Sequence, residues 1–499
     1  MRKPLCLALL TTLLTALAGA SLAAEPGSFG TLSSGISLFA ASDDEAGLEV
    51  WRSDGTSAGT YRLTDDACND YCEEFNYFFA PWIEAGNRAF IYAQENEVST
   101  LWVTDGSRDG TFPVYEGTRI SNLQRPVWVK RLKLLFFVVQ VASTPFDYEL
   151  WRSDGTPEGT RKVKTFVSAD TRPGVQELTE FGGRAFFNGQ DPVHGPALWT
   201  SDGTEAGTVL VRDFIRDEEG AGPIWLWAVG SRLVFAAPSP TSGTMLWASD
   251  GTRAGTRQLQ PLQIGGYATI HDARVVGRYL FLSVERELWI SDGTRAGTRS
   301  LGTFASPPAL SLETLLNGRY YFEARTDELD WEVWSTDGTR AGTRMLLDIC
   351  PRGCSGVSPE SRLAVVGGRL LFTATNRAHG TKLWQSDGTA QGTRMIQSST
   401  TPGYQRMGSG PVHVAGGRIL FSAADSALSV PQLWRTDGTK NGTVRLTNVV
   451  ANGVADELIG KIPGALLFRV TNESGLDQLW VSNGTLPGTR LLKTIRAGG

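Results

Sequence analysis

The fold is decided by one stretch, Leu150-Trp151-Arg152-Ser153-Asp154-Gly155-Thr156-Pro157-Glu158-Gly159-Thr160, of which the chain carries ten related copies. The tryptophan recurs as Trp51, Trp102, Trp151, Trp199, Trp247, Trp289, Trp334, Trp384, Trp434 and Trp480, at intervals of 42 to 51 residues. A period of this size is typical of propellers and solenoids, in which each repeat packs against its neighbours. Repetition, rather than a single catalytic domain, therefore organises the chain.

Each copy predicts a β-hairpin. Leu150 and Trp151 are adjacent, so in a strand they project to opposite faces. The following Ser-Asp-Gly-Thr predicts a turn, because an aspartate side chain accepts bonds from nearby backbone N–H groups and glycine adopts a positive φ without strain. The aspartate is replaced only in the last copy, by Asn483, which a turn also tolerates.

A second signal precedes each hairpin, as in Gly367-Gly368-Arg369-Leu370-Leu371-Phe372, with another short apolar stretch before it. In that copy the four expected strands are 363–366, 369–373, 382–385 and 393–396. Bulky apolar residues fall on both faces of these strands, which indicates sheets that are buried on both sides. Repeated four-stranded antiparallel sheets of this kind predict an all-β protein, a β-propeller of ten four-stranded repeats.

The ten repeats could close as one ten-bladed ring or as two five-bladed rings. Two rings should be separated by a linker near the middle of the chain, yet the interval from Trp247 to Trp289 is the shortest, at 42 residues. The sequence therefore favours a single ring in which the first and last repeats are in contact. The first strand of the first repeat, expected at 28–32, is weakly specified.

The repeat resembles that of a known family. Glu49-Val50-Trp51-Arg52-Ser53-Asp54-Gly55-Thr56 and the equivalent stretch at 287–294 are similar to the ELWxxDGT repeat of secreted bacterial proteins, also called hyalin-like. The hairpins are also similar to those of TolB-type propellers and to the Asp-box loops of sialidases. No tryptophan follows the second Gly-Thr, so this resemblance does not imply sialidase chemistry, and the ELWxxDGT family implies no particular activity.

The N-terminus predicts export. Met1-Arg2-Lys3 is followed by an apolar run at 5–17 and by small residues up to Ala23, the pattern of a secretory signal peptide over 1–23. The remaining 24–499 would form the propeller domain of a secreted, periplasmic or cell-surface protein. No other apolar run approaches the roughly 20 residues of a membrane span. A net charge of −5 argues against a nucleic-acid partner.

The cysteines after the expected signal peptide lie in two pairs, Cys68 with Cys72 and Cys350 with Cys354. An even number in an exported chain predicts two local disulfides. The alternative, a metal site, would require four ligands in suitable geometry, and no histidine is near either pair in the sequence.

The stretch around the first pair is the least repeat-like part of the chain. It is a candidate loop for a protein partner or a cation, because loops on rigid scaffolds often carry function; the alternative is a solvated acidic insertion. The candidate residues are Asp65, Asp66, Asp70, Tyr71, Glu73 and Glu74.

Candidate chemistry is sparse elsewhere. The four histidines, His194, His271, His379 and His413, show no consistent nucleophile or carboxylate partner in the sequence. Each repeated turn offers one carboxylate, whereas Ca²⁺ takes six to eight oxygen ligands, so a turn cap is favoured over calcium binding. No cofactor is expected, and calcium remains an alternative.

These patterns predict an exported β-propeller that is a binding or scaffolding module for a protein or glycan partner, and not an enzyme. One alternative is a glycan-acting or other hydrolase with its site in the propeller channel. Such an enzyme should show carboxylates or histidines confined to one or two repeats at channel-facing positions, and the sequence shows no such constellation. The other alternative is a structural surface or matrix protein.

Overall fold

The computed structural model describes residues 30–495 apart from several internal segments. The segments outside it are 43–47, 65–81, 96–97, 122–124, 142–146, 168–173, 215–221, 240–242, 263–267, 311–313, 326–330, 352–354, 358–362, 397–412, 416–417, 424–429, 449–453 and 472–476. Within the described part all regular structure is β-strand, in ten antiparallel sheets, one for each repeat. The all-β prediction is confirmed.

The strands follow chain order within each sheet, and nine of the sheets have four strands. In repeats 2 to 10 the first strands are β4 (Ile83–Ala85), β8 (Val127–Val129), β12 (Val175–Phe181), β16 (Ile224–Val229), β20 (Ile270–Val276), β24 (Leu315–Leu316), β28 (Ala364–Val366), β32 (His413–Ala415) and β36 (Val454–Ile462). The second strands are β5 (Arg88–Glu95), β9 (Leu134–Gln140), β13 (Arg184–Asp191), β17 (Arg232–Ser239), β21 (Tyr279–Val284), β25 (Arg319–Arg325), β29 (Arg369–Asn376), β33 (Arg418–Ala423) and β37 (Ala465–Thr471).

The hairpin predicted from the repeat joins the third and fourth strands. The third strands are β6 (Val98–Thr104), β10 (Tyr148–Ser153), β14 (Gly195–Ser201), β18 (Gly243–Ser249), β22 (Glu287–Ser291), β26 (Trp331–Thr336), β30 (Gly380–Ser386), β34 (Gln432–Thr436) and β38 (Asp477–Ser482). The fourth are β7 (Phe112–Thr118), β11 (Arg161–Phe166), β15 (Val209–Asp213), β19 (Arg257–Pro261), β23 (Arg299–Thr303), β27 (Arg344–Met345), β31 (Arg394–Met395), β35 (Val444–Arg445) and β39 (Arg490–Thr494).

The first repeat is smaller. Its described strands are β1 (Ser37–Ser42), β2 (Leu48–Ser53) and β3 (Tyr61–Arg62), and an isolated bridge between Thr31 and Ser37 takes the place of a first strand. The weak first strand expected at 28–32 is therefore reduced to a single bridge.

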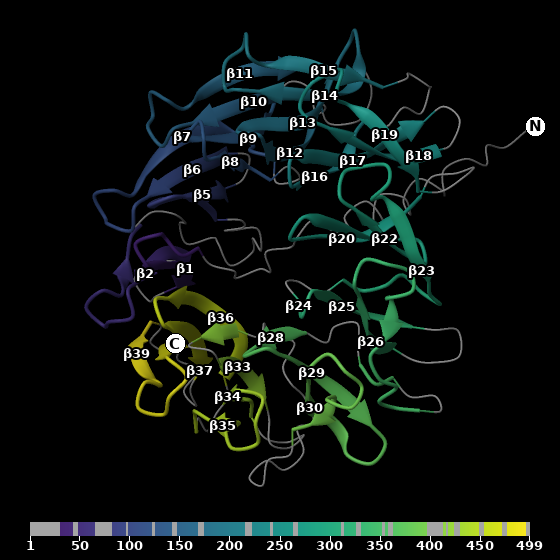
Figure 1. The fold of residues 1–499 in the computed structure, drawn as a ribbon. Helices are drawn as coiled ribbons and strands as arrows, with labels where there is room; N and C mark the ends of the chain where they lie inside the picture. Colours follow the sequence, from purple (N-terminus) through teal and green to yellow (C-terminus); the bar gives the residue numbers. More distant parts are fainter. Residues whose placement is uncertain are drawn as a thin grey trace, which may run out of the picture.

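The sheets are the blades of one closed ring. The first strand of each blade lies toward the middle of the ring and the fourth lies at the outside (Figure 1). Repeats 1 and 10 are in contact: Arg490 Nη2 donates to the carbonyl of Gly55 over 3.3 Å, and Lys493 Nζ donates to the carbonyl of Thr60 over 2.9 Å. The single ten-bladed ring is confirmed, and the alternative of two five-bladed rings is wrong.

The hydrophobic core explains why the ring closes. It consists of ten clusters of buried side chains, each shared by two adjacent blades, and one of them joins Phe39 and Trp51 of repeat 1 to Leu467 and Leu479 of repeat 10. An open array would expose both terminal apolar faces to water, and closure buries them against each other.

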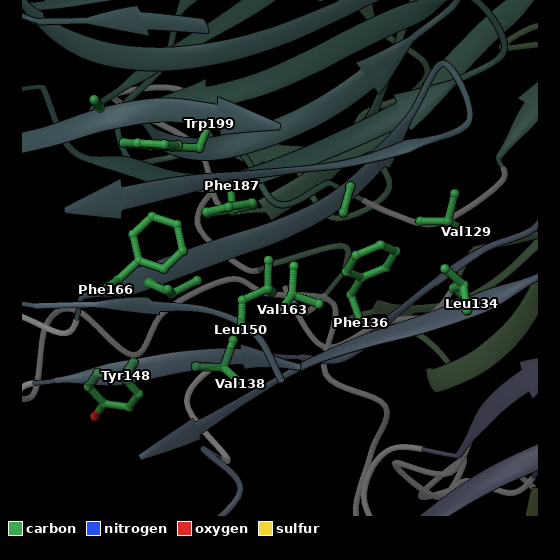
Figure 2. Packing of buried hydrophobic residues seen from close by; sticks show 13 residues of the cluster. Val129, Leu134, Phe136, Val138, Tyr148, Leu150, Val163, Phe166, Phe187 and Trp199 are labelled. Atoms are coloured by element: carbon green, nitrogen blue, oxygen red, sulfur yellow. The ribbon is translucent and has the colours of Figure 1, made fainter. Parts of the chain in front are cut away.

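The cluster between repeats 3 and 4 shows how the recurrent tryptophan packs (Figure 2). Phe166 of β11 meets Phe187 and Trp199 of the next blade edge to face, with ring centroids 5.4 and 5.3 Å apart. Five of the ten repeat tryptophans are buried, namely Trp51, Trp199, Trp247, Trp384 and Trp434, and the other five are partly buried. The repeat tryptophan therefore packs in the core between blades.

The repeated turn is held by its own side chains. Asp54 Oδ1 accepts the backbone N–H of Thr56 at 2.9 Å and its hydroxyl at 2.7 Å, and the Thr56 hydroxyl in turn accepts the N–H of Gly59. Gly55 has a φ of 86°, and a Cβ at Gly59 would lie 2.0 Å from Asp54 Oδ2. The same aspartate or asparagine cap forms in all ten repeats, which explains why both glycines recur.

Candidate functional site

The first strands of the blades, which line the middle of the ring, are not alike. In repeats 4, 5 and 6 they contain 7, 6 and 7 residues, and β36 of repeat 10 contains 9. In repeats 2, 3, 7, 8 and 9 they contain only two or three residues. Because repeats 4 to 6 are consecutive, β12, β16 and β20 form one continuous stretch of the inner wall, which we call the inner sector (Figure 1).

All three strands of the inner sector carry a β-bulge. The register with the second strand shifts between Gln176 and Thr179 in β12, between Ile224 and Trp227 in β16, and between Ile270 and Asp272 in β20. A bulge bends its strand and re-aims the side chains beside it, and bulges are over-represented next to active sites. The bulges of β12 and β16 are at equivalent positions, and that of β20 lies farther from the turn to its second strand.

Two bulge residues have unusual backbone conformations. Glu177 has a φ of 59° and Trp225 a φ of 57°, although neither is glycine. They occupy equivalent places, each ten residues before the phenylalanine that pairs with the repeat tryptophan, Phe187 or Phe235. A bulky residue at positive φ is strained and persists only where its surroundings hold it.

Contacts between the two blades provide that support. The Glu177 carboxylate accepts the backbone N–H groups of Trp225 and Leu226, and the hydroxyl of Thr179 donates to the carbonyl of Leu226 over 3.3 Å. Burial raises the pKa of Glu177, and the bonds from the two backbone N–H groups partly oppose this rise. Side chains of β12 therefore satisfy backbone groups at the bulge of β16, whose ladder is interrupted there.

The bulge of β16 presents two aromatic side chains together. The rings of Trp225 and Trp227 are almost parallel, with an angle of 5° between their planes and 6.4 Å between their centroids. Both side chains are partly exposed and pack against the hydrophobic cluster between repeats 5 and 6. An aromatic pair therefore lies on the strand of repeat 5 that is nearest to the middle of the ring.

The third strand of the sector adds polar groups. His271 is exposed, and Asp272 forms an ion pair with Arg274 over 2.5 Å between Oδ1 and Nη1. Asp272 also accepts the N–H of Ala273 at 2.7 Å and that of Leu310 at 3.3 Å. Burial raises the pKa of Asp272, and the charge of Arg274 offsets part of that rise.

The sector could hold a ligand, but the described residues do not show a catalytic site. Glycoside hydrolysis by retention needs two carboxyl groups about 5–5.5 Å apart that act on the substrate. The carboxylate of Glu177 is engaged by backbone N–H groups of the next blade, and that of Asp272 by Arg274 and by backbone N–H groups. Both carboxyl groups thus support the fold of the sector.

The sequence contained one signal of this sector. Five of the 15 tryptophans lie outside the repeat position, and Trp225 and Trp227 are two of them. Because they are two residues apart, a regular strand would place both on the same face. The bulges and the positive φ angles had no sequence signal, because Glu177 and Trp225 are not residues that favour positive φ.

The candidate partner loop cannot be placed. Asp65, Asp66, Asp70, Tyr71, Glu73 and Glu74 lie outside the described residues, as do Cys68, Cys72 and Cys354. Cys350 is described, is buried and is disulfide-bonded. The two expected pairings remain predictions.

The Cys350 loop is anchored by a carboxylate that was not predicted. Glu332, two residues before the repeat tryptophan, is 2 % exposed, and its Oε1 accepts the N–H of Cys350 at 3.4 Å. The N–H groups of Ile349 and Gly356 also bond to this carboxylate. Burial raises the pKa of Glu332 to about 7, although these N–H groups lower it.

Glutamates at the equivalent position of other repeats, two residues before the repeat tryptophan, differ in their burial and in their hydrogen-bond partners. Glu49 of repeat 1 is fully buried and bonds to the hydroxyl of Thr64, shortly before the other cysteine pair in sequence. Glu149 and Glu287 are partly exposed and instead accept the indole N–H of Trp151 at 2.9 Å and of Trp289 at 2.8 Å. A fully buried glutamate at this position therefore occurs in the two repeats that contain cysteine pairs.

The remaining candidate histidines lie in turns or begin a strand. His194 lies 3.0 Å from Asp191 and the His379 N–H donates to Asn376, both in turns between second and third strands, while His413 begins β32. Among the described residues no group of three or more His, Cys, Asp or Glu is placed to hold a metal. The absence of a cofactor remains a prediction, and calcium remains its alternative. No helix in the described part is long and apolar enough to span a membrane.

No protein-family model matches the chain, and no curated protein is similar to it in sequence. Solved structures that it resembles include two of a puromycin hydrolase, with 14% and 15% identity and TM-scores of 0.29 and 0.30, over 68% and 70% of this chain. A tricorn protease matches 92% of this chain with 10% identity and a TM-score of 0.25. The matched regions span 57%, 60% and 43% of those proteins.

The likeness is one of propeller-type fold, and it corrects one expectation. The chain was expected to be a binding or scaffolding module with no identifiable catalytic site, with a hydrolase as the alternative, but the solved structures that it resembles are a hydrolase and a protease. At these identities the likeness concerns the propeller-type fold alone, and the described residues show no catalytic site.

Proposed function

We propose that the propeller serves a hydrolase. In this proposal the inner sector holds the substrate, and a catalytic unit separate from the described blades cleaves the bond. The observation that carries the proposal is that β12, β16 and β20, three consecutive inner strands, are all long and bulged.

The cost of building this sector supports a functional role. Residues such as Glu177 and Trp225 at positive φ cost on the order of 1–3 kcal/mol each. The short inner strands of repeats 7 to 9 close the same ring and belong to the same repeat. Packing between neighbouring blades therefore does not by itself require long, bulged inner strands.

A separate catalytic unit follows from the state of the acidic groups. Glu177 and Asp272 are both held in bonds that stabilise the sector, so neither is available to transfer a proton to a substrate without disrupting it. In this view the chain is not itself the enzyme but determines which substrate reaches one.

The proposal also covers the repeat family, the export and the disulfides of the chain. Its repeat resembles that of the ELWxxDGT proteins, and a signal peptide at 1–23 would export it to the periplasm, the cell surface or the medium. Disulfides Cys68–Cys72 and Cys350–Cys354 would form there. Peptide mapping of exported protein without reduction tests these pairings, and free thiols at all four positions would contradict them.

The functional test compares the chain alone with the chain and its native associates. We expect tagged chain isolated from its own host to carry hydrolysis of fluorogenic glycoside or peptide substrates, and the recombinant mature chain alone to have none. Glu177→Ala should raise the KM of the associated activity, whereas Glu180→Ala, on the same strand but bonded to Gly183 of its own turn, should not. Full activity of the chain alone would contradict the separate catalytic unit, and the absence of any associated hydrolysis would contradict the function.

A further inference from the structure

The aromatic pair on β16 indicates what kind of substrate the inner sector would take. We infer that Trp225 and Trp227 bind neutral hexose rings of a carbohydrate chain, an inference that rests on the proposed role of the sector in holding substrate. The two rings are parallel within 5°, lie 6.4 Å apart and are partly exposed. The C–H-rich faces of pyranose rings pack against aromatic faces, and indole N–H groups can donate to sugar hydroxyls.

The charges around the pair favour a neutral ligand. On the neighbouring inner strand, Asp272 and Arg274 neutralise each other across 2.5 Å. The Glu177 carboxylate on the other side faces backbone N–H groups of Trp225 and Leu226. An acidic polymer would find no unpaired cation in these groups, whereas neutral hydroxyl groups need none.

The backbone of the sector argues against a peptide. Extended peptides usually bind by adding a strand to a regular sheet edge, where main-chain hydrogen bonds provide affinity. In β16 the register shifts between Ile224 and Trp227, and in β12 between Gln176 and Thr179. Bulges of this kind interrupt an edge and protect it from strand addition. The ligand must therefore be recognised by side chains, and Trp225 and Trp227 are the large ones available.

A polar group completes the recognition surface. His271 is exposed on β20, and Ile270 and Ala273 of the same strand share the hydrophobic cluster against which both tryptophans pack. An exposed histidine on the strand next to β16 can bond to sugar hydroxyls while the tryptophan rings provide the apolar contact.

The test measures binding of neutral hexose oligosaccharides, such as cellohexaose, maltohexaose and mannohexaose, to the full mature chain by calorimetry and tryptophan fluorescence. We expect saturable binding of at least one of them, weakened at least tenfold by Trp227→Ala. Trp128→Ala is the matched control, because Trp128 is a partly exposed tryptophan on the short inner strand β8 and has no second tryptophan beside it on that strand. It should leave the affinity unchanged.

Trp227→Phe separates a loss of sugar binding from a loss of folding, since phenylalanine retains an apolar ring against the cluster. We expect it to keep the wild-type unfolding midpoint and to bind sugar several-fold more weakly. Equal affinity of wild type and Trp227→Ala, or no binding of any neutral oligosaccharide, would overturn the inference.

If the associated hydrolase cleaves peptides and the sector binds peptides instead, the proposed function stands and only the substrate class fails. If sugars bind but no hydrolysis accompanies the chain, the proposed function fails and the sugar site stands.

Discussion

Repeats 4 to 6 and repeats 7 to 9 contain the same hairpin and different inner strands. The turn bonds of Asp202 in repeat 4 and Asp387 in repeat 8 are alike, with the threonine N–H 2.9 Å from Oδ1 in both. Toward the middle of the ring, β12, β16 and β20 are long and bulged, whereas β24, β28 and β32 contain two or three residues. The outer half of each blade therefore builds the ring, and the inner strand is the part that is free to vary with function.

The largest effect is expected from the shared part of the blade. Trp247 is 6 % exposed and packs edge to face against Phe214, with ring centroids 5.2 Å apart. Trp247→Ala should lower the free energy of unfolding by about 3–5 kcal/mol, because it leaves a cavity between blades. Denaturant unfolding with two probes measures this loss and shows whether the ring still unfolds cooperatively. A midpoint equal to that of wild type would show that the tryptophan is not core.

The second prediction concerns Glu332, whose pKa is raised from 4.5 to about 7. Its protonated form is favoured in the folded state, so its contribution to stability is present below pH 4.5 and is lost as the pH rises through 7. The loss could reach about 3 kcal/mol. Glu332→Gln should therefore be more stable relative to wild type at pH 8 than at pH 4.5. An equal difference at both pH values, measured by denaturant titration, would show that Glu332 does not titrate in this range.

A smaller effect is expected inside the sector itself. Glu177→Ala leaves the N–H groups of Trp225 and Leu226 without their carboxylate and should cost about 1–3 kcal/mol. Glu180→Ala, which loses a bond to the Gly183 turn, should cost about 0.5–1.5 kcal/mol. Fluorescence of Trp225 and Trp227 should change only in the first variant. If both variants give the same spectrum and stability, Glu177 does not hold the bulge of β16.

The smallest effect is expected from one repeated turn. Bonds from Thr56 lower the pKa of Asp54 below 3.8, so its contribution to stability is present above pH 3.8 and is lost as the pH falls through the lowered pKa. The group is largely exposed, which limits this contribution to a few tenths of a kcal/mol. Asp54→Asn should match wild type at pH 7 within about 0.5 kcal/mol, because Asn483 makes the same bonds in repeat 10. A large loss at pH 7 would indicate that the aspartate charge has another role, such as calcium binding, which added EDTA would then reproduce.

The sequence was informative where every repeat faces the same physical demand. The spacing of the tryptophans, the Asp-Gly-Thr cap and the apolar residues on both strand faces predicted the blades, and the unbroken period predicted the single ring. Inner strands were harder to predict, because a bulge depends on contacts with the next blade. The Glu177 carboxylate bonds to the N–H groups of Trp225 and Leu226, which are 48 and 49 residues later in the sequence. No local sequence pattern encodes that contact. Glu332 was missed for the same reason, since its partners Cys350 and Gly356 lie in a loop that folds back over it.

Hydrogen exchange on the native assembly tests most directly whether the inner sector holds the substrate. The exchange of the full chain with its associated hydrolase would be compared with and without a saturating, uncleavable analogue of the substrate that this hydrolase cleaves. We expect slower exchange in β12, β16 and β20 and unchanged exchange in β24, β28 and β32. Protection in repeats 7 to 9, or equal protection around the whole ring, would contradict the account.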